Sequence, residues 1–142
     1  MDYPSLKLLH LIAAATWLSG LVGNGLAVAL LAGSTSAGSR ALLGSLCTWN
    51  RWVTLPAALL LLAAGASIAW VGGWLMMPWL WIKLALVAAL LPVQIGLGRA
   101  LRQMAGGDAS APPTLLRVAA PAVFCAGLII GVLALTKPAW GA

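Results

Sequence analysis

The residues most able to do chemistry are His10 and Lys83, each about one turn inside a long apolar stretch. An ionisable side chain in such a stretch costs free energy unless it is paired or lines a cavity. His10 is the only histidine in the chain, and imidazole is a common ligand of haem iron. We therefore interpret His10 as a cofactor ligand or proton relay, with an interfacial hydrogen bond as the alternative. Lys83 either pairs with an anionic group or extends its ammonium to lipid headgroups.

Both residues belong to polar stripes on their helices. His10, Trp17 and Asn24 are spaced by seven residues and therefore share one helix face, with small residues beside them. Lys83 and Gln94 are eleven residues apart, close to a whole number of turns, and share a face of another helix. We expect both stripes to face the interior, with Asn24 and Gln94 forming hydrogen bonds between helices. An interior lined with small residues can hold a flat macrocycle such as haem.

Several other classes of chemistry have little support in the sequence. A copper site needs a second histidine, a cysteine or a methionine cluster at the depth of His10, and only Met76 and Met77 are adjacent. The sequence has no Ser/His/acid set, no paired carboxylates and no phosphate-binding glycine loop, so hydrolysis and nucleotide binding are excluded. The net charge of +6 comes from basic residues scattered between apolar stretches, which argues against nucleic acid as a partner.

Hydropathy predicts the elements that position these residues. The chain of 142 residues is 63% hydrophobic and 7% charged, whereas a soluble domain is about 25% charged. Four stretches are long enough to cross a hydrocarbon core about 30 Å thick. These stretches are residues 6–32, 52–71, 78–101 and 115–136. The pattern predicts an all-α fold, an integral membrane four-helix up-down bundle, as one transmembrane domain over residues 1–142. The intervening segments, rich in Gly, Ser and Pro, are expected to be loops.

The basic residues predict the orientation in the bilayer. Five arginines are expected on one side, namely Arg40, Arg51, Arg99, Arg102 and Arg117. Three lysines are expected on the other, namely Lys7, Lys83 and Lys137. The positive-inside tendency then predicts a multi-pass protein of the bacterial inner (cytoplasmic) membrane, with arginines in the cytoplasm and both termini outside. An outer interfacial belt is expected from Trp70, Trp74, Trp79, Trp81 and Trp140.

Several short segments resemble a known membrane family. They are LKLLHLI at residues 6–12, TWLSGL at 16–21, LPA at 55–57 and WIKL at 81–84. In order and spacing they look like the HemJ-type protoporphyrinogen oxidases and the related CopD-like membrane domains. The resemblance covers about the first hundred residues and the four-span length.

The resemblance implies a function for three residues. His10 would bind the iron of haem b, Trp17 would pack against the macrocycle, and Lys83 would pair with a propionate or an anionic substrate. The enzyme would oxidise protoporphyrinogen and pass electrons to a quinone or a larger membrane complex. The family usually has a second histidine in its third span, where Gln94 stands here. Two histidine ligands therefore cannot come from one copy of this chain.

This departure leaves several alternatives open. Haem could be held by one histidine, shared between chains of a homo-oligomer, or not bound at all. A protein without haem would be a non-catalytic accessory subunit of a larger membrane complex or a CopD-like metal-handling protein. The sequence does not decide whether the chain is an enzyme, and it identifies no catalytic residue.

Overall fold

The computed structural model describes residues 2–31, 36–106 and 118–140, and nearly all of them are helical. The α-helices are α1 (Tyr3–Leu31), α2 (Ala37–Trp49), α3 (Leu55–Gly72), α4 (Pro78–Ala105) and α6 (Ala119–Trp140). Two short elements join them, the π-helix η1 (Asn50–Thr54) and the 3₁₀-helix η2 (Trp74–Met76).

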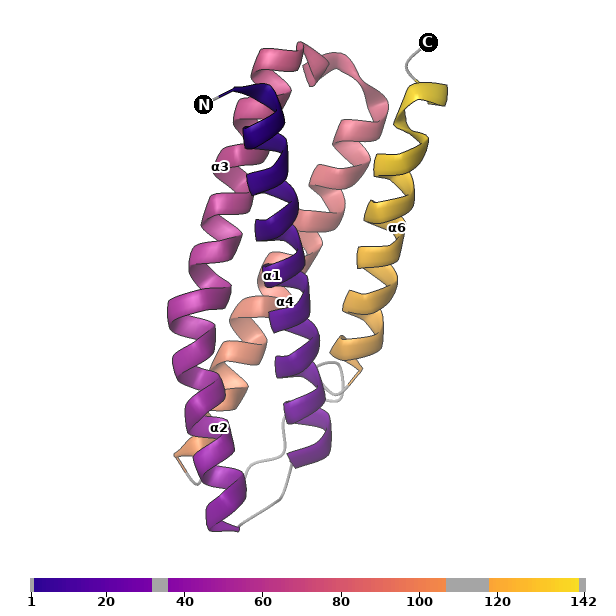
Figure 1. The fold of residues 1–142 in the computed structure, drawn as a ribbon. Helices are drawn as coiled ribbons and strands as arrows, with labels where there is room; N and C mark the ends of the chain where they lie inside the picture. Colours follow the sequence, from indigo (N-terminus) through magenta and orange to yellow (C-terminus); the bar gives the residue numbers. More distant parts are fainter. Residues whose placement is uncertain (1, 32–35, 107–117, 141–142) are drawn as a thin grey trace.

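The long helices lie side by side in an elongated arrangement. Helix α1 packs against α3, α4 and α6, while α2 packs against α4. The first described residues, η2 and the end of α6 lie at one end of the molecule, and the start of α2 lies at the other (Figure 1). Three helical segments, Tyr3–Leu31, Ala37–Gly72 and Pro78–Ala105, are long and apolar enough to cross a membrane. In α6 the described apolar stretch is shorter, Pro121–Val132.

The expectation of a loop over residues 33–51 was wrong for 37–51, which form α2 and the start of η1. The helix begins at Ser36, whose side chain accepts a hydrogen bond from the Ser39 amide at 3.1 Å. Leu43 is fully buried where α2 packs on α4. Glycine and serine lower helix propensity only modestly, and burial of an apolar side chain against a neighbouring helix outweighs that cost.

The helix of residues 37–72 is continuous because η1 accommodates Pro56. Proline has no amide hydrogen, and its ring collides with the carbonyl four residues earlier in a regular α-helix. In η1 the amide of Leu55 instead bonds to the carbonyl of Asn50, five residues earlier, which widens this turn. The span predicted at residues 52–71 would have Pro56 near its start. In the structure it lies inside a much longer helix.

The turn between α3 and α4 agrees with the short connection expected at residues 72–77. Helix α3 ends at Gly73, whose φ of 67° is in the left-handed region that glycine adopts at little cost. The chain then passes through η2, and α4 begins at Pro78. Proline suits this position because the first amide of a helix has no partner within the helix.

Helix α1 approaches the helix of residues 37–72 closely at Gly20. A Cβ atom added there would overlap the Oγ1 atom of Thr54 and lie 2.9 Å from its Cγ2. Thr54 is completely buried, so its side chain has no free space to move into. Glycine is therefore required at position 20 for the two helices to keep this distance.

We expect Gly20→Ala to destabilise the fold by about 1–3 kcal/mol, because the added methyl overpacks a closed contact. Thermal unfolding of the detergent-purified protein measures the effect. The matched control is Gly23→Ala, where a Cβ meets nothing within 4 Å, so that stability should stay the same or rise. Adding Thr54→Ala to Gly20→Ala should restore part of the loss. Equal effects of the two glycine substitutions would contradict the role given to Gly20.

Candidate functional site

The imidazole of His10 lies in a notch on α3 formed by Gly65. A Cβ on Gly65 would lie 3.0 Å from Cε1 and 3.4 Å from Nδ1 of the imidazole, so a larger residue would displace the ring. Nδ1 is buried and makes no hydrogen bond of good geometry, although the Leu61 backbone one turn earlier is close enough to interact with the ring. His10 is thus directed between the helices, as its position in the polar stripe predicted.

Lys83 belongs to an aromatic cluster at the same end of the molecule. Its Nζ lies 4.9 Å from the centroid of the Trp79 ring, within range of a cation–π interaction. Trp79 is buried and packs edge-on against Trp74 with 5.5 Å between ring centroids. Trp74 in turn contacts Tyr3 in a T-shaped arrangement. Lys83 is half-buried and close enough for its charge to act on His10.

The aromatic cluster changes the interpretation of the expected tryptophan belt. Trp70 and Trp81 are exposed, 77% and 61% respectively, as belt residues would be. Trp79 is buried instead and supports the Lys83 ammonium, and Trp74 packs on it. The side chain of Trp140 lies outside the described residues.

Trp17 and Gln94 form a buried bridge between α1 and α4. The indole Nε1 of Trp17, whose side chain is 1% exposed, donates a hydrogen bond to Oε1 of Gln94. This bridge confirms that Gln94 joins helices. Because Nε1 of Trp17 is used in this hydrogen bond, only the surface of the indole ring is available to contact a ligand.

Asn24 and Asn50 form a second bridge, between α1 and η1. Nδ2 of Asn24 donates to Oδ1 of Asn50 at 3.0 Å, and both side chains are buried. Asn24 was expected to bridge helices, and this is confirmed. Sequence reasoning missed Asn50, because the segment before residue 52 was interpreted as a loop and its helical faces were not considered.

A column of unpaired polar atoms follows the inner face of α1. Within the described part of the chain, four buried side-chain atoms have no hydrogen-bond partner, namely His10 Nδ1, Gln94 Nε2, Asn24 Oδ1 and Thr54 Oγ1. A buried polar group without a partner costs about 1–3 kcal/mol, so these four atoms lower the stability of the fold unless water reaches them.

The donor set limits which metal chemistry is possible. Among the described residues no group of three His, Cys, Asp or Glu side chains could hold a metal ion. Cys47 and Cys125 are both free thiols. His10 can contribute one imidazole, which suits a prosthetic group that brings its own equatorial donor atoms.

Comparison with known proteins found no matching family model, no matching curated protein and no matching solved structure.

The Trp17–Gln94 bridge should show energetic coupling between α1 and α4. We expect Gln94→Leu to be destabilising because it leaves the indole donor unpaired in an apolar interior. A double-mutant cycle of Trp17→Phe and Gln94→Leu, followed by thermal unfolding, should give a coupling energy of about 0.6–1.7 kcal/mol. Fully additive effects would show that the hydrogen bond contributes nothing to stability.

Proposed function

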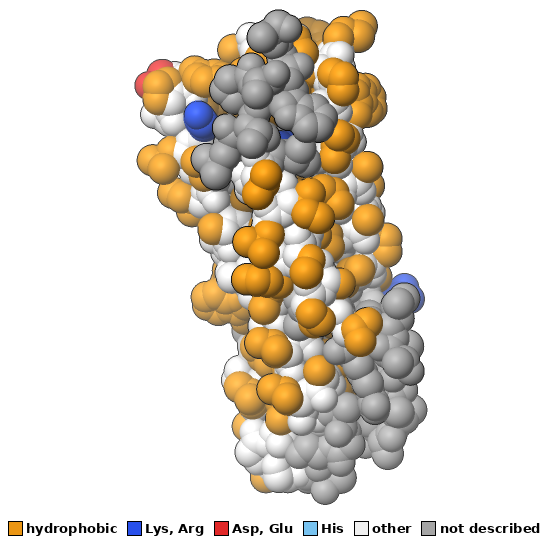
Figure 2. Space-filling view, turned by 90° about the vertical axis from the view of Figure 1, so that its right-hand side faces the viewer, with side chains coloured by type: hydrophobic (Ala, Val, Ile, Leu, Met, Phe, Trp, Pro, Cys, Tyr) orange, Lys and Arg blue, Asp and Glu red, His pale blue; other side chains and the backbone are white. Residues whose placement is uncertain are grey.

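We propose that this chain is an integral membrane protein in which α1, the helix of residues 37–72, α4 and α6 cross a bilayer as an up-down bundle. Large apolar side chains are among its most exposed groups, for example Ile12 and Leu59. Figure 2 shows hydrophobic side chains over most of the coloured surface on one face. Such a surface would drive aggregation in water but is stable against lipid tails.

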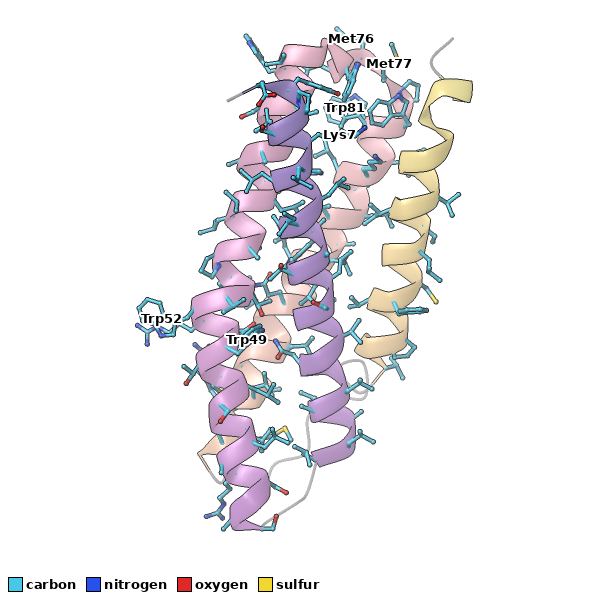
Figure 3. The ribbon with its side chains drawn as sticks, viewed as in Figure 1. Lys7, Trp49, Trp52, Met76, Met77 and Trp81 are labelled. Atoms are coloured by element: carbon cyan, nitrogen blue, oxygen red, sulfur yellow. The ribbon has the colours of Figure 1, made fainter. Side chains whose placement is uncertain are left out.

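Two tryptophans on one helix support a position for the bilayer. Trp52 and Trp70 are exposed and 18 residues apart, which is about 27 Å along a helix. This distance is close to the thickness of the hydrocarbon core, about 30 Å, and tryptophan side chains favour both of its boundaries. Figure 3 shows Trp52 extending away from the bundle, with Trp81 and Met76 toward the other end.

The arginine-rich end is assigned to the cytoplasm. Arg40, Arg99 and Arg102 lie near the start of α2 and the end of α4, while Lys7 and Lys83 lie toward the opposite end. Arginine and lysine near span ends accumulate on the cytoplasmic side of membrane proteins. This proposal puts both termini outside and the protein in the bacterial inner membrane.

Within this frame we propose that the protein binds haem b and transfers electrons. The observation that carries the proposal is the His10 imidazole, whose Cε1–Nδ1 edge is held in the Gly65 notch, so that Nε2 is the nitrogen that would bind iron. Ligating histidines are commonly oriented by a backbone group at the ring nitrogen that does not bind metal, and the Leu61 backbone is available here. One imidazole is sufficient for haem, whereas zinc or copper would require several protein ligands.

Other residues of this end support the same ligand. The Lys83 ammonium provides a positive charge for a carboxylate, such as a propionate or an anionic substrate. The indole of Trp17 is buried on the same face of α1 as His10 and would pack against the macrocycle. Haem supplies one-electron transfer when bound, and its electrons would pass to a quinone or a partner complex. Protoporphyrinogen is the substrate that the resemblance to HemJ-type enzymes implies.

The two interhelical bridges favour a second candidate, a non-catalytic accessory subunit or a CopD-like metal-handling protein. Trp17–Gln94 and Asn24–Asn50 use most of the polar stripe to hold helices together. In this case the polar residues contribute to helix association, and His10 has no cofactor to bind.

An absorption spectrum of the detergent-purified protein tests the haem proposal. We expect a Soret band that His10→Ala abolishes, because the chain has no other imidazole. Lys83→Met should lower the haem content less, because it removes a charge and leaves the ligand in place. Gly65→Ala should weaken haem retention through the displaced ring, whereas Gly23→Ala, an open position, should not.

The outcomes separate the two candidate functions. A full-length wild-type protein that is colourless, even when haem is supplied during expression, and that copurifies with other subunits supports the accessory role. Equal loss of haem in His10→Ala and Lys83→Met would show that the ligand is misassigned.

A further inference from the structure

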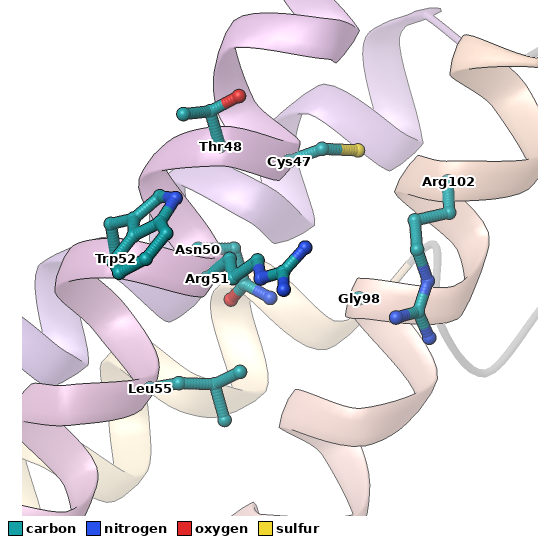
Figure 4. Close-up of a pocket in the computed structure, with 8 residues that line it drawn as sticks. All are labelled: Cys47, Thr48, Asn50, Arg51, Trp52, Leu55, Gly98 and Arg102. Carbon is teal, nitrogen blue, oxygen red and sulfur yellow. The ribbon is translucent and has the colours of Figure 1, made fainter.

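A second polar site lies where η1 faces α4, away from His10. A pocket of about 390 Å³ opens between Arg51 on η1 and Arg102 on α4, and Gly98 forms part of its wall. Figure 4 shows the Arg51 side chain extending from its helix toward α4, with Arg102 on the other side of the gap. The haem proposal uses none of these residues.

The pocket carries positive charge without a balancing acid. Among the described residues the only acid is Asp2, which precedes α1 at the other end of the molecule. Arg51 lies over the ring of Trp52 at 5.7 Å from its centroid, a contact that leaves the guanidinium hydrogens available. Two guanidinium groups beside one cavity favour an anion between them, and their donor geometry suits phosphate.

Asn50 adds a neutral donor at the back of the pocket. Its side chain is 8% exposed, and its Oδ1 is used by Asn24. Its Nδ2 makes no hydrogen bond within the described part of the chain. A Cβ on Gly98 would lie 3.1 Å from this Nδ2, so the missing side chain leaves the amide open toward the pocket. An amide donor that lines a cationic cavity is suited to an anionic oxygen.

The outer wall of the pocket is apolar and exposed. Trp52 and Leu55 line it and are 69% and 42% exposed. By the Trp52–Trp70 spacing, the pocket lies at the inner boundary of the hydrocarbon core. A ligand there has its anionic part beside the arginines and its apolar part against lipid-facing side chains. A phospholipid has both an anionic part and an apolar part, whereas a free anion has only the first, so the pocket suits a phospholipid better.

We propose that this pocket binds the phosphate of an anionic phospholipid from the cytoplasmic leaflet, with Arg51, Arg102 and Asn50 Nδ2 as donors. Basic pockets between helices on the cytoplasmic side commonly hold such headgroups. The proposal rests on the membrane-spanning arrangement described above, but it does not depend on haem. A failure of the haem proposal would be seen in the absorption spectrum and would leave this site unaffected.

Lipid titration of the full-length, delipidated protein in detergent tests the proposal. Thermal unfolding is followed while phosphatidylglycerol, phosphatidylcholine or inorganic phosphate is added at equal phosphorus concentration. We expect phosphatidylglycerol to stabilise the protein at much lower concentration than the other two, because phosphatidylcholine has no net charge and inorganic phosphate has no apolar part.

Paired substitutions locate the effect. Arg51→Gln with Arg102→Gln should raise the half-saturating concentration of phosphatidylglycerol about 30-fold, since each arginine near an anionic headgroup contributes about fivefold. The control is Arg40→Gln with Arg99→Gln, which removes the same charge from exposed positions outside the pocket and should change little. Equal weakening in both pairs would overturn the proposal in favour of general electrostatic attraction.

Two further outcomes would also overturn it. If phosphatidylcholine stabilises the protein as strongly as phosphatidylglycerol, the net charge of the lipid is not what the site recognises. If inorganic phosphate stabilises it as strongly, the site binds a free anion and not a phospholipid. If the double variant does not fold, native mass spectrometry of the wild-type protein provides the test. Retention of phosphatidylglycerol but not phosphatidylcholine through delipidation supports the site, and equal retention of the two overturns it.

Discussion

The close contact between α1 and the helix of residues 37–72 is the interaction on which the other features depend. Two glycines on opposite partners permit it, since Gly20 on α1 makes room for Thr54 and Gly65 on α3 makes room for His10. Lipid tails are as apolar as leucine side chains, so helices in a bilayer associate through close packing and hydrogen bonds rather than the hydrophobic effect. The glycines allow both, because backbone approach brings the polar groups of α1 within reach of neighbouring helices.

The π-helix η1 connects the interior of the molecule to its periphery. A turn with one extra residue rotates the preceding helix by about 100° relative to the following one, and it does so here just before Pro56. Asn50 lies on the inner side of this turn and bonds to Asn24, while Arg51 and Trp52 are exposed. A single backbone adjustment thus supplies one partner of a buried bridge and one wall of the arginine pocket.

The two ends of the molecule offer different chemistry. At one end the structure has a partly buried imidazole, an ammonium and aromatic rings packed edge-on. At the other, guanidinium groups face a cavity open to the surrounding medium. In the proposed membrane-spanning arrangement, a chain with few charges places most of them near the boundaries of the bilayer. The two proposals accordingly assign different ligands to the two ends, a cofactor to the first and an anionic lipid to the second.

Local properties of the sequence were sufficient for part of this description. The helical class, the approximate bounds of α1 and α4, the end of the helix of residues 37–72 and the inward face of the His10 stripe follow from hydropathy and a period of 3.6 residues. Asn24 and Gln94 were also expected to bridge helices, because a polar side chain in an apolar span needs a partner.

The tertiary structure alone decided the rest. Helix α2 forms despite its Gly and Ser content because Leu43 is buried against α4, a contact distant in sequence. The identities of the bridging partners, the burial of Trp79 under Lys83 and the pocket beside Gly98 likewise depend on which helices meet and in what rotation. The sequence of one helix does not determine which side chains will contact it, because those contacts depend on packing between segments far apart in the chain.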